Sequence, residues 1–213
     1  MLVGKRMKFP VITVAPDMPI IEALNLMKRE RIRRTPVVKD GRLVGIVSDK
    51  DLLNASPSPV TSLSVWEMNY LLSKITVKDV MTKEVLSIGE DTPIEEAARV
   101  MADNKIGGLP VMRGEQVVGI ITETDIFKIF LELMGARQPG VRASVLVTEK
   151  PGELAKVTKT IAELGGNFLA FGTFMGENPT NRLVTFKVTG LSVEQVRQSI
   201  TPIVEEIIDI RSI

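Results

Sequence analysis

Gly119–Asp125 reads GIITETD, and 74 residues earlier in the chain Gly45–Asp51 reads GIVSDKD. The same spacing relates positions on both sides of these stretches. The pairs include Met7 and Met81, Pro19 and Pro93, Glu22 and Glu96, Ala23 and Ala97, Met27 and Met101, and Pro36 and Pro110. A fixed spacing across apolar and turn positions marks a duplicated supersecondary unit. The N-terminal part of the chain is therefore predicted to contain two copies of one unit.

Each copy ends in an apolar strand that is followed by a hydroxyl and, three residues later, by an aspartate. These residues are Ser48 and Asp51 in the first copy, and Thr122 and Asp125 in the second. A hydroxyl at the end of a strand can donate to a phosphate, and a carboxylate one helical turn later can accept from both hydroxyls of a ribose. Both aspartates also stand where an acid caps the following helix. The pattern indicates nucleotide binding without catalysis, with helix capping as the alternative.

Both copies are predicted to have the order β-α-β-β-α. Apolar residues recur with helical spacing after the leading strand, and Thr92, Pro93 and Glu95 predict a capping box at the start of the second copy's helix. Strands are expected at Val11–Val14, Pro36–Val38 and Leu43–Ser48 in the first copy, and at Val85–Ile88, Pro110–Met112 and Val117–Thr122 in the second. Such a unit is too small to bury both faces of its sheet, so the two copies are expected to pack against each other.

Between the copies lies a connector, residues 54–74, with a Pro/Ser-rich start. Ser64 and Glu67 predict the capping box of a short helix that places Trp66 and Tyr70 on one face. The two aromatic side chains either pack the connector onto its own domain or a dimer mate, or form an interaction stripe.

After Gly135 the pattern changes. A linker comes first, followed by a strand at Val141–Val147. A helix then begins at Pro151–Gly152 and ends at Gly165–Gly166. A hairpin, a second helix and a last strand follow. The hairpin is expected at Asn167–Met175 and Leu183–Val188, the helix after a cap of Ser192 and Gln195, and the last strand at Ile203–Ile210. This β-α-β-β-α-β order predicts a ferredoxin-like sheet with helices on one side. The predicted domains are residues 1–53, the connector 54–74, residues 75–135, and residues 136–213.

Composition excludes several function classes. The 213 residues contain neither Cys nor His, which removes disulfides, thiol nucleophiles, zinc fingers and His-based proton relays. No Gly-rich phosphate loop is present, so we expect no catalytic residues and no enzyme activity, although Asp, Glu, Lys and Tyr leave catalysis open. No bound metal is expected, with a site made only of oxygen ligands as the alternative. Aromatic residues make up 4%, which argues against a nucleic-acid surface. No apolar run is long enough to span a membrane and the N-terminus lacks a signal peptide's apolar stretch, so a cytoplasmic protein is expected.

The net charge of +1 is unevenly distributed. Residues 1–53 carry 11 Lys and Arg against 6 Asp and Glu. Arg31, Arg33 and Arg34 crowd beside an expected strand, which indicates either an anion site or a solvated basic face.

The doubled pattern resembles a tandem pair of CBS domains over about residues 1–135. The segment EKPGELAKVTKTIAELGGN, Glu149–Asn167, resembles an ACT domain. The order of these parts, with an ASPS-type insert and an ARQPG linker, is similar to that of the AcuB-type acetoin-utilisation proteins. The resemblance implies an α/β (α+β) protein with a tandem CBS pair followed by a ferredoxin-like ACT domain.

In CBS pairs an adenine nucleotide binds in composite clefts between the repeats, so the resemblance implies two sites. In the first cleft, phosphate and ribose would meet Ser48, Lys50 and Asp51, and adenine would meet Thr82, Leu86, Ile106, Gly107, Gly108, Leu109 and Pro110. The second cleft would combine Thr122, Thr124 and Asp125 with Lys8, Ile12, Ile32, Arg33, Arg34, Thr35 and Pro36. Gly107 and Gly108 admit close backbone approach, whereas the two arginines suit phosphate. The second cleft is therefore expected to prefer the more highly charged nucleotide.

The ACT resemblance implies a small ligand, often an amino acid, near Glu149, Gly152 and Asn167, beside an adjoining subunit. The alternative is a domain that only dimerises. Together the two resemblances imply a homodimeric regulatory protein that senses AMP, ADP or ATP and acts on an unidentified protein. The alternatives are an adaptor whose nucleotide clefts are not functional and an ACT-type amino-acid sensor.

Overall fold

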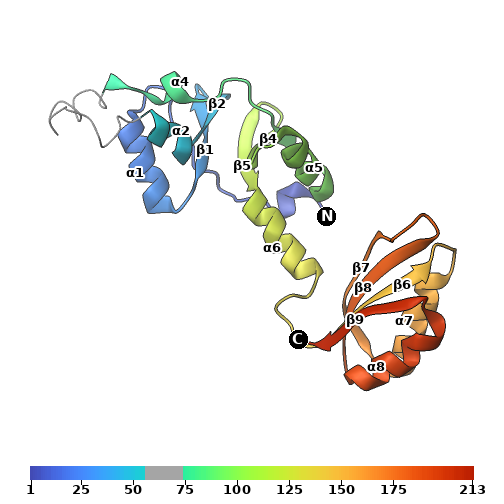
Figure 1. Cartoon of the computed structure of the whole chain (residues 1–213). Helices are drawn as coiled ribbons and strands as arrows, with labels where there is room; N and C mark the ends of the chain where they lie inside the picture. Colours follow the sequence, from blue (N-terminus) through green and yellow to red (C-terminus); the bar gives the residue numbers. More distant parts are fainter. Residues whose placement is uncertain (56–73) are drawn as a thin grey trace. The chain divides into compact units, whose positions relative to one another are not determined.

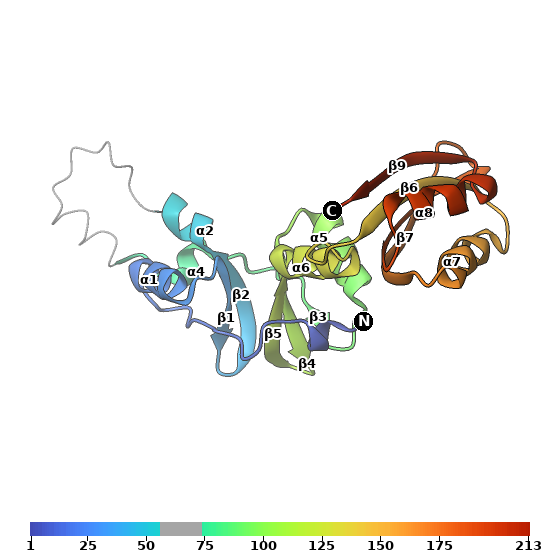
Figure 2. The same cartoon turned by 90° about the horizontal axis from the view of Figure 1, so that it is seen from below.

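The computed structural model describes residues 1–55 and 74–213 and divides into two compact units, Met1–Ile126 and Phe127–Ile213 (Figures 1 and 2). The helices are η1 (Val3–Lys5), α1 (Ile20–Glu30), α2 (Asp49–Asn54), α4 (Val77–Val80), α5 (Ile94–Asn104), α6 (Glu123–Leu133), α7 (Glu153–Glu163), α8 (Val193–Ile200) and η2 (Thr201–Ile203). The strands are β1 (Arg34–Lys39), β2 (Arg42–Ser48), β3 (Ile88–Gly89), β4 (Gly108–Arg113), β5 (Gln116–Thr122), β6 (Val141–Thr148), β7 (Asn167–Met175), β8 (Asn181–Thr189) and β9 (Glu206–Ser212). In these two described ranges no helix has the length and apolarity to cross a membrane. The predicted connector helix with Trp66 and Tyr70 lies outside the described residues.

The duplication predicted from the sequence is confirmed at the level of single residue pairs. The antiparallel hairpin β1–β2 pairs Pro36 with Ile46, and the hairpin β4–β5 pairs Pro110 with Ile120, each 74 residues later. Both hairpins carry a register shift at the same place, between Val37 and Val38 in one copy and at the equivalent pair in the other.

The first long helix of each copy buries the predicted apolar face. Ile20, Ala23 and Met27 of α1 are at most 1% exposed, and α5 buries the residues at the equivalent positions. Spacings of three and four residues put these side chains on one stripe of the helix, which packs onto the hairpin of its own copy. In the first copy this core includes Val37 and Val47.

The predicted start of α5 is wrong. The helix begins at Ile94, Pro93 is the N-cap residue with extended backbone, and no side chain caps it. The amide of Ile94 instead donates to the carbonyl of Met1 at 3.0 Å. In the first copy the amide of Ile20 donates in the same way to the carbonyl of Ile75 at 3.1 Å. In each copy, the first amide of the helix therefore donates to a backbone carbonyl of the segment that precedes the other copy. No capping side chain is needed for that amide.

The predicted leading strands are shorter than expected. Val14 alone in the segment 11–14 pairs with β1, through a bridge to Val37, and β3 consists of Ile88 and Gly89. Lys8 already pairs with Ile120 of β5, so the backbone between Lys8 and Val14 crosses from one copy to the other and only its ends pair.

The second unit has the predicted β-α-β-β-α-β order, with an antiparallel sheet in the strand order β7-β8-β6-β9. Val157 and Ile161 of α7, and Val196 and Ile200 of α8, form one buried core with the inward side chains of β6 and β8. Both helices therefore cover the same face of the sheet, as the figures show. This arrangement confirms the predicted ferredoxin-like topology.

Two predicted helix boundaries in this unit are also confirmed. Ser192 and Gln195 form the capping box of α8, with the amide of Gln195 donating to Ser192 Oγ at 3.2 Å. Gly165, with φ 83°, follows the last turn of α7, where a residue without a Cβ is favoured. The division between the compact units falls within α6, whereas residue 135, the boundary expected from the sequence, lies just after this helix.

Candidate functional site

The two repeats of the first unit exchange their leading segments. The amide of Thr82 and the carbonyl of Ile46 in β2 are 2.9 Å apart, and the reverse bond between Ile46 and Thr82 has the same length. At the equivalent place, Lys8 donates to the carbonyl of Ile120 in β5 at 2.8 Å. Each repeat thereby completes the sheet edge of the other, and every cleft beside these edges contains residues of both repeats.

Gly45 and Gly119, the first residues of the repeated stretches, make this exchange possible. A Cβ at Gly45 would lie 3.0 Å from Met81 Cγ and 3.1 Å from the carbonyl oxygen of Thr82. A Cβ at Gly119 would lie 2.9 Å from Met7 Cγ. Both distances are shorter than ordinary van der Waals contact, so only glycine lets the methionine of the opposite repeat pack against the strand. We did not single out this role from the sequence, although the paired Gly and Met positions carried the signal.

A cavity of about 350 Å³ lies in the first of the two predicted clefts. Its lining residues come from β2 and the start of α2, from the segment after α4, and from the junction of α5 with β4. They are Arg34, Ile46, Val47, Ser48, Asp51, Thr82, Glu84, Val85, Leu86, Lys105, Ile106, Gly107 and Gly108. The volume falls within the range of small-molecule sites, roughly 300–1,000 Å³.

Seven residues predicted for this cleft line the cavity. They are Ser48, Asp51, Thr82, Leu86, Ile106, Gly107 and Gly108. Three others do not. Lys50 is exposed at the start of α2, whereas Leu109 and Pro110 are buried within β4. The segment that lines the cavity ends at Gly108.

The paired hydroxyl and carboxylate bind each other in both copies, and in the first copy they form a complete capping box. Asp51 Oδ2 accepts from the amide of Ser48 at 2.8 Å and from its hydroxyl at 2.7 Å, and the amide of Asp51 donates to Ser48 Oγ at 3.3 Å. Asp125 Oδ2 accepts the equivalent bonds from Thr122 at 3.0 and 2.7 Å. The capping role of both aspartates is therefore present in the structure. These bonds use Oδ2, and Asp51 Oδ1 accepts no hydrogen bond from residues 1–55 or 74–213.

Arg34 does not lie where the sequence placed it. The sequence assigned Arg34 to the second cleft, but its side chain lines the first. A Cβ at Gly107 would lie 2.8 Å from Arg34 Cζ, and one at Gly108 would lie 3.0 Å from Arg34 Nη1. The two glycines leave the room that the guanidinium occupies, which is why the residue at the start of β1 reaches across to the start of β4. Burial lowers the pKa of the Arg34 guanidinium, although the Glu123 carboxylate opposes this shift.

The second predicted cleft is organised differently. Arg33 Nη2 donates to Thr124 Oγ1 at 3.0 Å, so two of its predicted ligand-binding residues bind each other. The Thr35 hydroxyl is fully buried and donates to the carbonyl of Ile12. Three other residues predicted for this cleft lie in different places. Lys8 pairs with β5, Ile32 is half-buried after α1, and Pro36 is buried within β1.

The residues predicted for an amino-acid ligand do not all come together. A cavity of about 200 Å³ in the second unit is lined by Val147, Thr148, Glu149, Lys150, Glu153, Leu154 and Arg182. Glu149 forms an ion pair with Arg182 at its rim. Gly152 has φ 93° as the N-cap of α7, a backbone conformation that favours glycine. Asn167 begins β7 and does not line this cavity.

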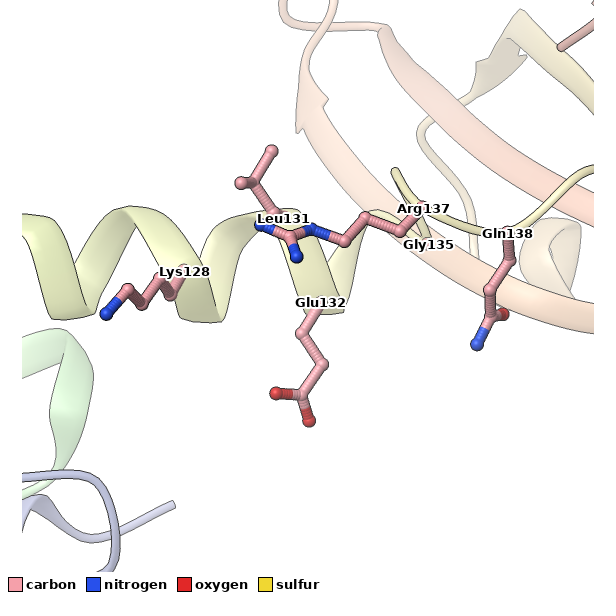
Figure 3. A pocket seen from close by; sticks show the side chains of 6 residues that line it. All are labelled: Lys128, Leu131, Glu132, Gly135, Arg137 and Gln138. Atoms are coloured by element: carbon pink, nitrogen blue, oxygen red, sulfur yellow. The ribbon is translucent and has the colours of Figure 1, made fainter.

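A larger cavity, about 430 Å³, contains none of the predicted site residues. It lies beside the end of α6, and Lys128, Leu131, Glu132, Gly135, Arg137 and Gln138 line it (Figure 3). Figure 3 shows Glu132 and Gln138 extending to the same side, Lys128 pointing away from both, and Arg137 extending towards Leu131. The polar groups do not converge on one point, so this cavity offers a weaker binding site than the smaller one between the repeats. No group of acidic residues in 1–55 and 74–213 is arranged to hold a metal ion.

Comparison with known proteins supports the duplicated architecture. The model of the CBS domain matches residues 3–58 and 77–132. The uncharacterized protein MJ1426 of Methanocaldococcus jannaschii is 32% identical in an alignment 155 positions long, which covers 62% of this chain and 92% of that protein. The crystal structure of the CBS domain pair of protein MJ0100 in complex with 5′-methylthioadenosine and S-adenosyl-L-methionine is 30% identical and has a TM-score of 0.52, with 65% of this chain and 98% of that chain covered. A structure from Vibrio cholerae described as an acetoin utilization protein (AcuB) is also 30% identical and has a TM-score of 0.53, with 65% and 96% covered.

Proposed function

The chain belongs to the CBS domain family, and we propose that it is a regulatory protein that senses an adenosine ligand in the cleft between its two CBS repeats. One observation carries the proposal. The predicted residues Ser48, Asp51, Thr82 and Gly107 come from both repeats and line one cavity of about 350 Å³. The MJ0100 structure, a CBS domain pair with two adenosine compounds, supports the ligand class.

In this proposal each part of the cavity meets a different part of the ligand. Leu86, which is 48% exposed, and Ile106 provide apolar surface for an adenine ring. Asp51 accepts from ribose hydroxyls through Oδ1 while Oδ2 continues to cap α2. Gly107 and Gly108 leave the room in which the Arg34 guanidinium lies against the backbone at the edge of the cavity. Ser48 donates to Asp51 in this structure, so its predicted bond to a phosphate requires the hydroxyl to rotate.

Such a ligand would act on the arrangement of the two repeats, because it would contact both of them. Because the leading segment of each repeat pairs with the other, a ligand that bridges Asp51 and Gly107 stabilises one arrangement of the two repeats over others. A ligand shifts a conformational equilibrium only by the difference in its affinity for the two states. The protein therefore needs a second element that reports the shift, and α6 leads directly from Thr122 and Asp125 towards the C-terminal unit.

The C-terminal unit supports a second part of the proposal. We take it to be an ACT domain that holds two copies of the chain together as a homodimer, because its helices cover only one face of its sheet and β7 is an edge strand. An amino acid is the proposed ligand of the small cavity near Glu149. The likeness to the Vibrio cholerae structure supports a role in acetoin or related carbon metabolism.

An adaptor protein with non-functional clefts is the alternative, and the capping bonds of Asp51 and Asp125 favour it. A thermal-shift titration of the full chain with AMP, ADP, ATP, S-adenosyl-L-methionine and 5′-methylthioadenosine separates the two. A ligand at 100 times its dissociation constant stabilises the folded chain by about 2.7 kcal/mol, which is a measurable shift in melting temperature. If none of the five compounds shifts the melting temperature, the adaptor is the better account.

A further inference from the structure

The two clefts differ most at one pair of equivalent positions. Gly107 and Gly108 of the first cleft stand 74 residues after Arg33 and Arg34, which hold the same places in the second. Bare backbone therefore borders the first cleft at these positions, whereas in the second cleft Arg33 donates to Thr124 and the Arg34 side chain reaches away into the first. The guanidinium of Arg34 fills part of the space that Gly107 and Gly108 leave in the first cleft.

The Arg34 side chain is half-buried on the wall of the first cavity. It makes no hydrogen bond or ion pair with residues 1–55 or 74–213, although the carboxylates of Glu123, Asp49 and Asp51 lie near enough to act on its charge. A half-buried cation has lost part of its hydration, and without a partner that loss is uncompensated. The carboxylate of Asp51, the nearest acid on the cavity wall, is already held by two bonds from Ser48.

Three other charged groups line the cavity. Lys105 adds a positive charge, and Asp51 and Glu84 add two negative charges, but neither carboxylate forms an ion pair with Arg34. The planar guanidinium therefore keeps its fork of donors beside the bare backbone of Gly107 and Gly108. This geometry suits a phosphate, which accepts two parallel bonds from one guanidinium.

We propose that the first cleft selects adenosine compounds that carry a phosphate, with Arg34 as the residue that binds it, and that each chain binds one such ligand. The inference rests on the proposed function and narrows it. Adenosine compounds whose 5′ group is neutral or a sulfonium cation lack the anion that Arg34 needs, so they bind more weakly.

The proposed limit of one ligand for each chain follows from the structure of the second cleft. The Arg33 side chain donates to Thr124 Oγ1 there, and Thr124 is one of the residues a ligand would use. A nucleotide must break this bond and displace a guanidinium from a site that has no glycine pair to make room. The first cleft needs neither change, because its cavity is already open.

The test is isothermal titration calorimetry of the full chain with AMP and with 5′-methylthioadenosine, which share the adenosine and differ in the 5′ group. For the wild type we expect one equivalent of AMP, bound at least tenfold more tightly than 5′-methylthioadenosine, since a hydrogen-bonded ion pair gives roughly tenfold or more in affinity. Arg34→Met should weaken AMP binding by about that factor and leave 5′-methylthioadenosine binding within about twofold. Arg34→Lys, which keeps the charge but not the fork, should fall between.

Arg29→Met is the matched control, because it removes one positive charge from the exposed end of α1, away from the cavity. It should bind AMP like the wild type. If Arg34→Met does not fold, as circular dichroism would show, Arg34→Lys and the wild-type preference still decide the matter. An unchanged ratio of AMP to 5′-methylthioadenosine affinity in Arg34→Met or Arg34→Lys overturns the inference but not the proposed function. Two equivalents of AMP overturn the single-site part. Binding of neither compound overturns the inference, and the thermal-shift titration with all five compounds then decides whether the proposed function stands.

Discussion

Asp51 has two roles in this account, and the substitutions Asp51→Ala and Asp51→Asn separate them. Asp51 Oδ2 accepts from the Ser48 amide and hydroxyl at 2.8 and 2.7 Å, which closes the capping box of α2. In Asp51→Ala both bonds are lost, and the partly buried Ser48 amide has no acceptor. Loss of a cap costs about 0.5–2 kcal/mol. We therefore expect the free energy of unfolding of Asp51→Ala to fall by about 1–2 kcal/mol.

Asp51→Asn retains a side-chain oxygen that accepts from the Ser48 amide, so we expect it to lose less than about half as much stability. Its affinity for an adenosine ligand should nevertheless fall as far as that of Asp51→Ala. Both variants lose the charged acceptor for the ribose hydroxyls, a bond of about 1.5–3 kcal/mol, which corresponds to roughly tenfold or more in affinity. Urea denaturation measures the first quantity, and calorimetric titration with AMP measures the second.

Asp125→Ala is the matched control, because Asp125 makes the equivalent two bonds to Thr122 at the second cleft. It should lose as much stability as Asp51→Ala and keep the wild-type affinity for AMP. The reasoning is refuted if Asp51→Asn binds AMP as tightly as the wild type, or if Asp125→Ala weakens binding as strongly as Asp51→Ala does.

Three further predictions follow from the packing and the charges. Gly45→Ala should destabilise the chain by about 1–3 kcal/mol through overpacking against Met81, and urea denaturation should show a much smaller loss when Gly45→Ala is made in a Met81→Ala background. The hydrogen bond from Arg211 lowers the pKa of the Asp209 carboxylate below its ordinary value of 3.8, so this carboxylate stabilises the fold above pH 3.8 and ceases to do so as the pH falls through the lower folded value. Asp209→Asn should therefore lower the melting temperature at pH 7, and the difference from the wild type should shrink as the pH is lowered below 3.8. Light scattering at micromolar concentration should give the mass of a dimer, and a monomer mass contradicts the proposed ACT-mediated association.

Much of the fold was predictable because the same pattern occurs twice, so the elements expected in one repeat can be checked against the other. Once GIVSDKD and GIITETD are aligned, the helices and hairpins of the two repeats follow from apolar spacing. The exchange of leading segments was not predictable in this way. Helix α5 was expected to begin with a side-chain cap at Thr92, but the carbonyl of Met1, 93 residues away from Ile94, takes that role. No local pattern records a long-range backbone bond of this kind.

The candidate site was predictable where backbone position decides the geometry. Ser48, Asp51 and Gly107 line the cavity because strand ends and helix starts place them there. The error concerns Arg34, whose long side chain reaches from the edge of one cleft into the other. Its direction depends on the empty space at Gly107 and Gly108, and the sequence gives the presence of those glycines but not which neighbour fills the space.

Hydrogen–deuterium exchange of the full chain, with and without saturating AMP, tests the central proposal most directly because it locates the bound ligand on the backbone. If an adenosine ligand binds in the first cleft, exchange should slow in residues 46–51, 82–86 and 105–108, and should stay unchanged in residues 8–12 and 122–125. Slower exchange confined to residues 8–12 and 122–125, or to residues 147–154 of the C-terminal unit, would contradict the proposal.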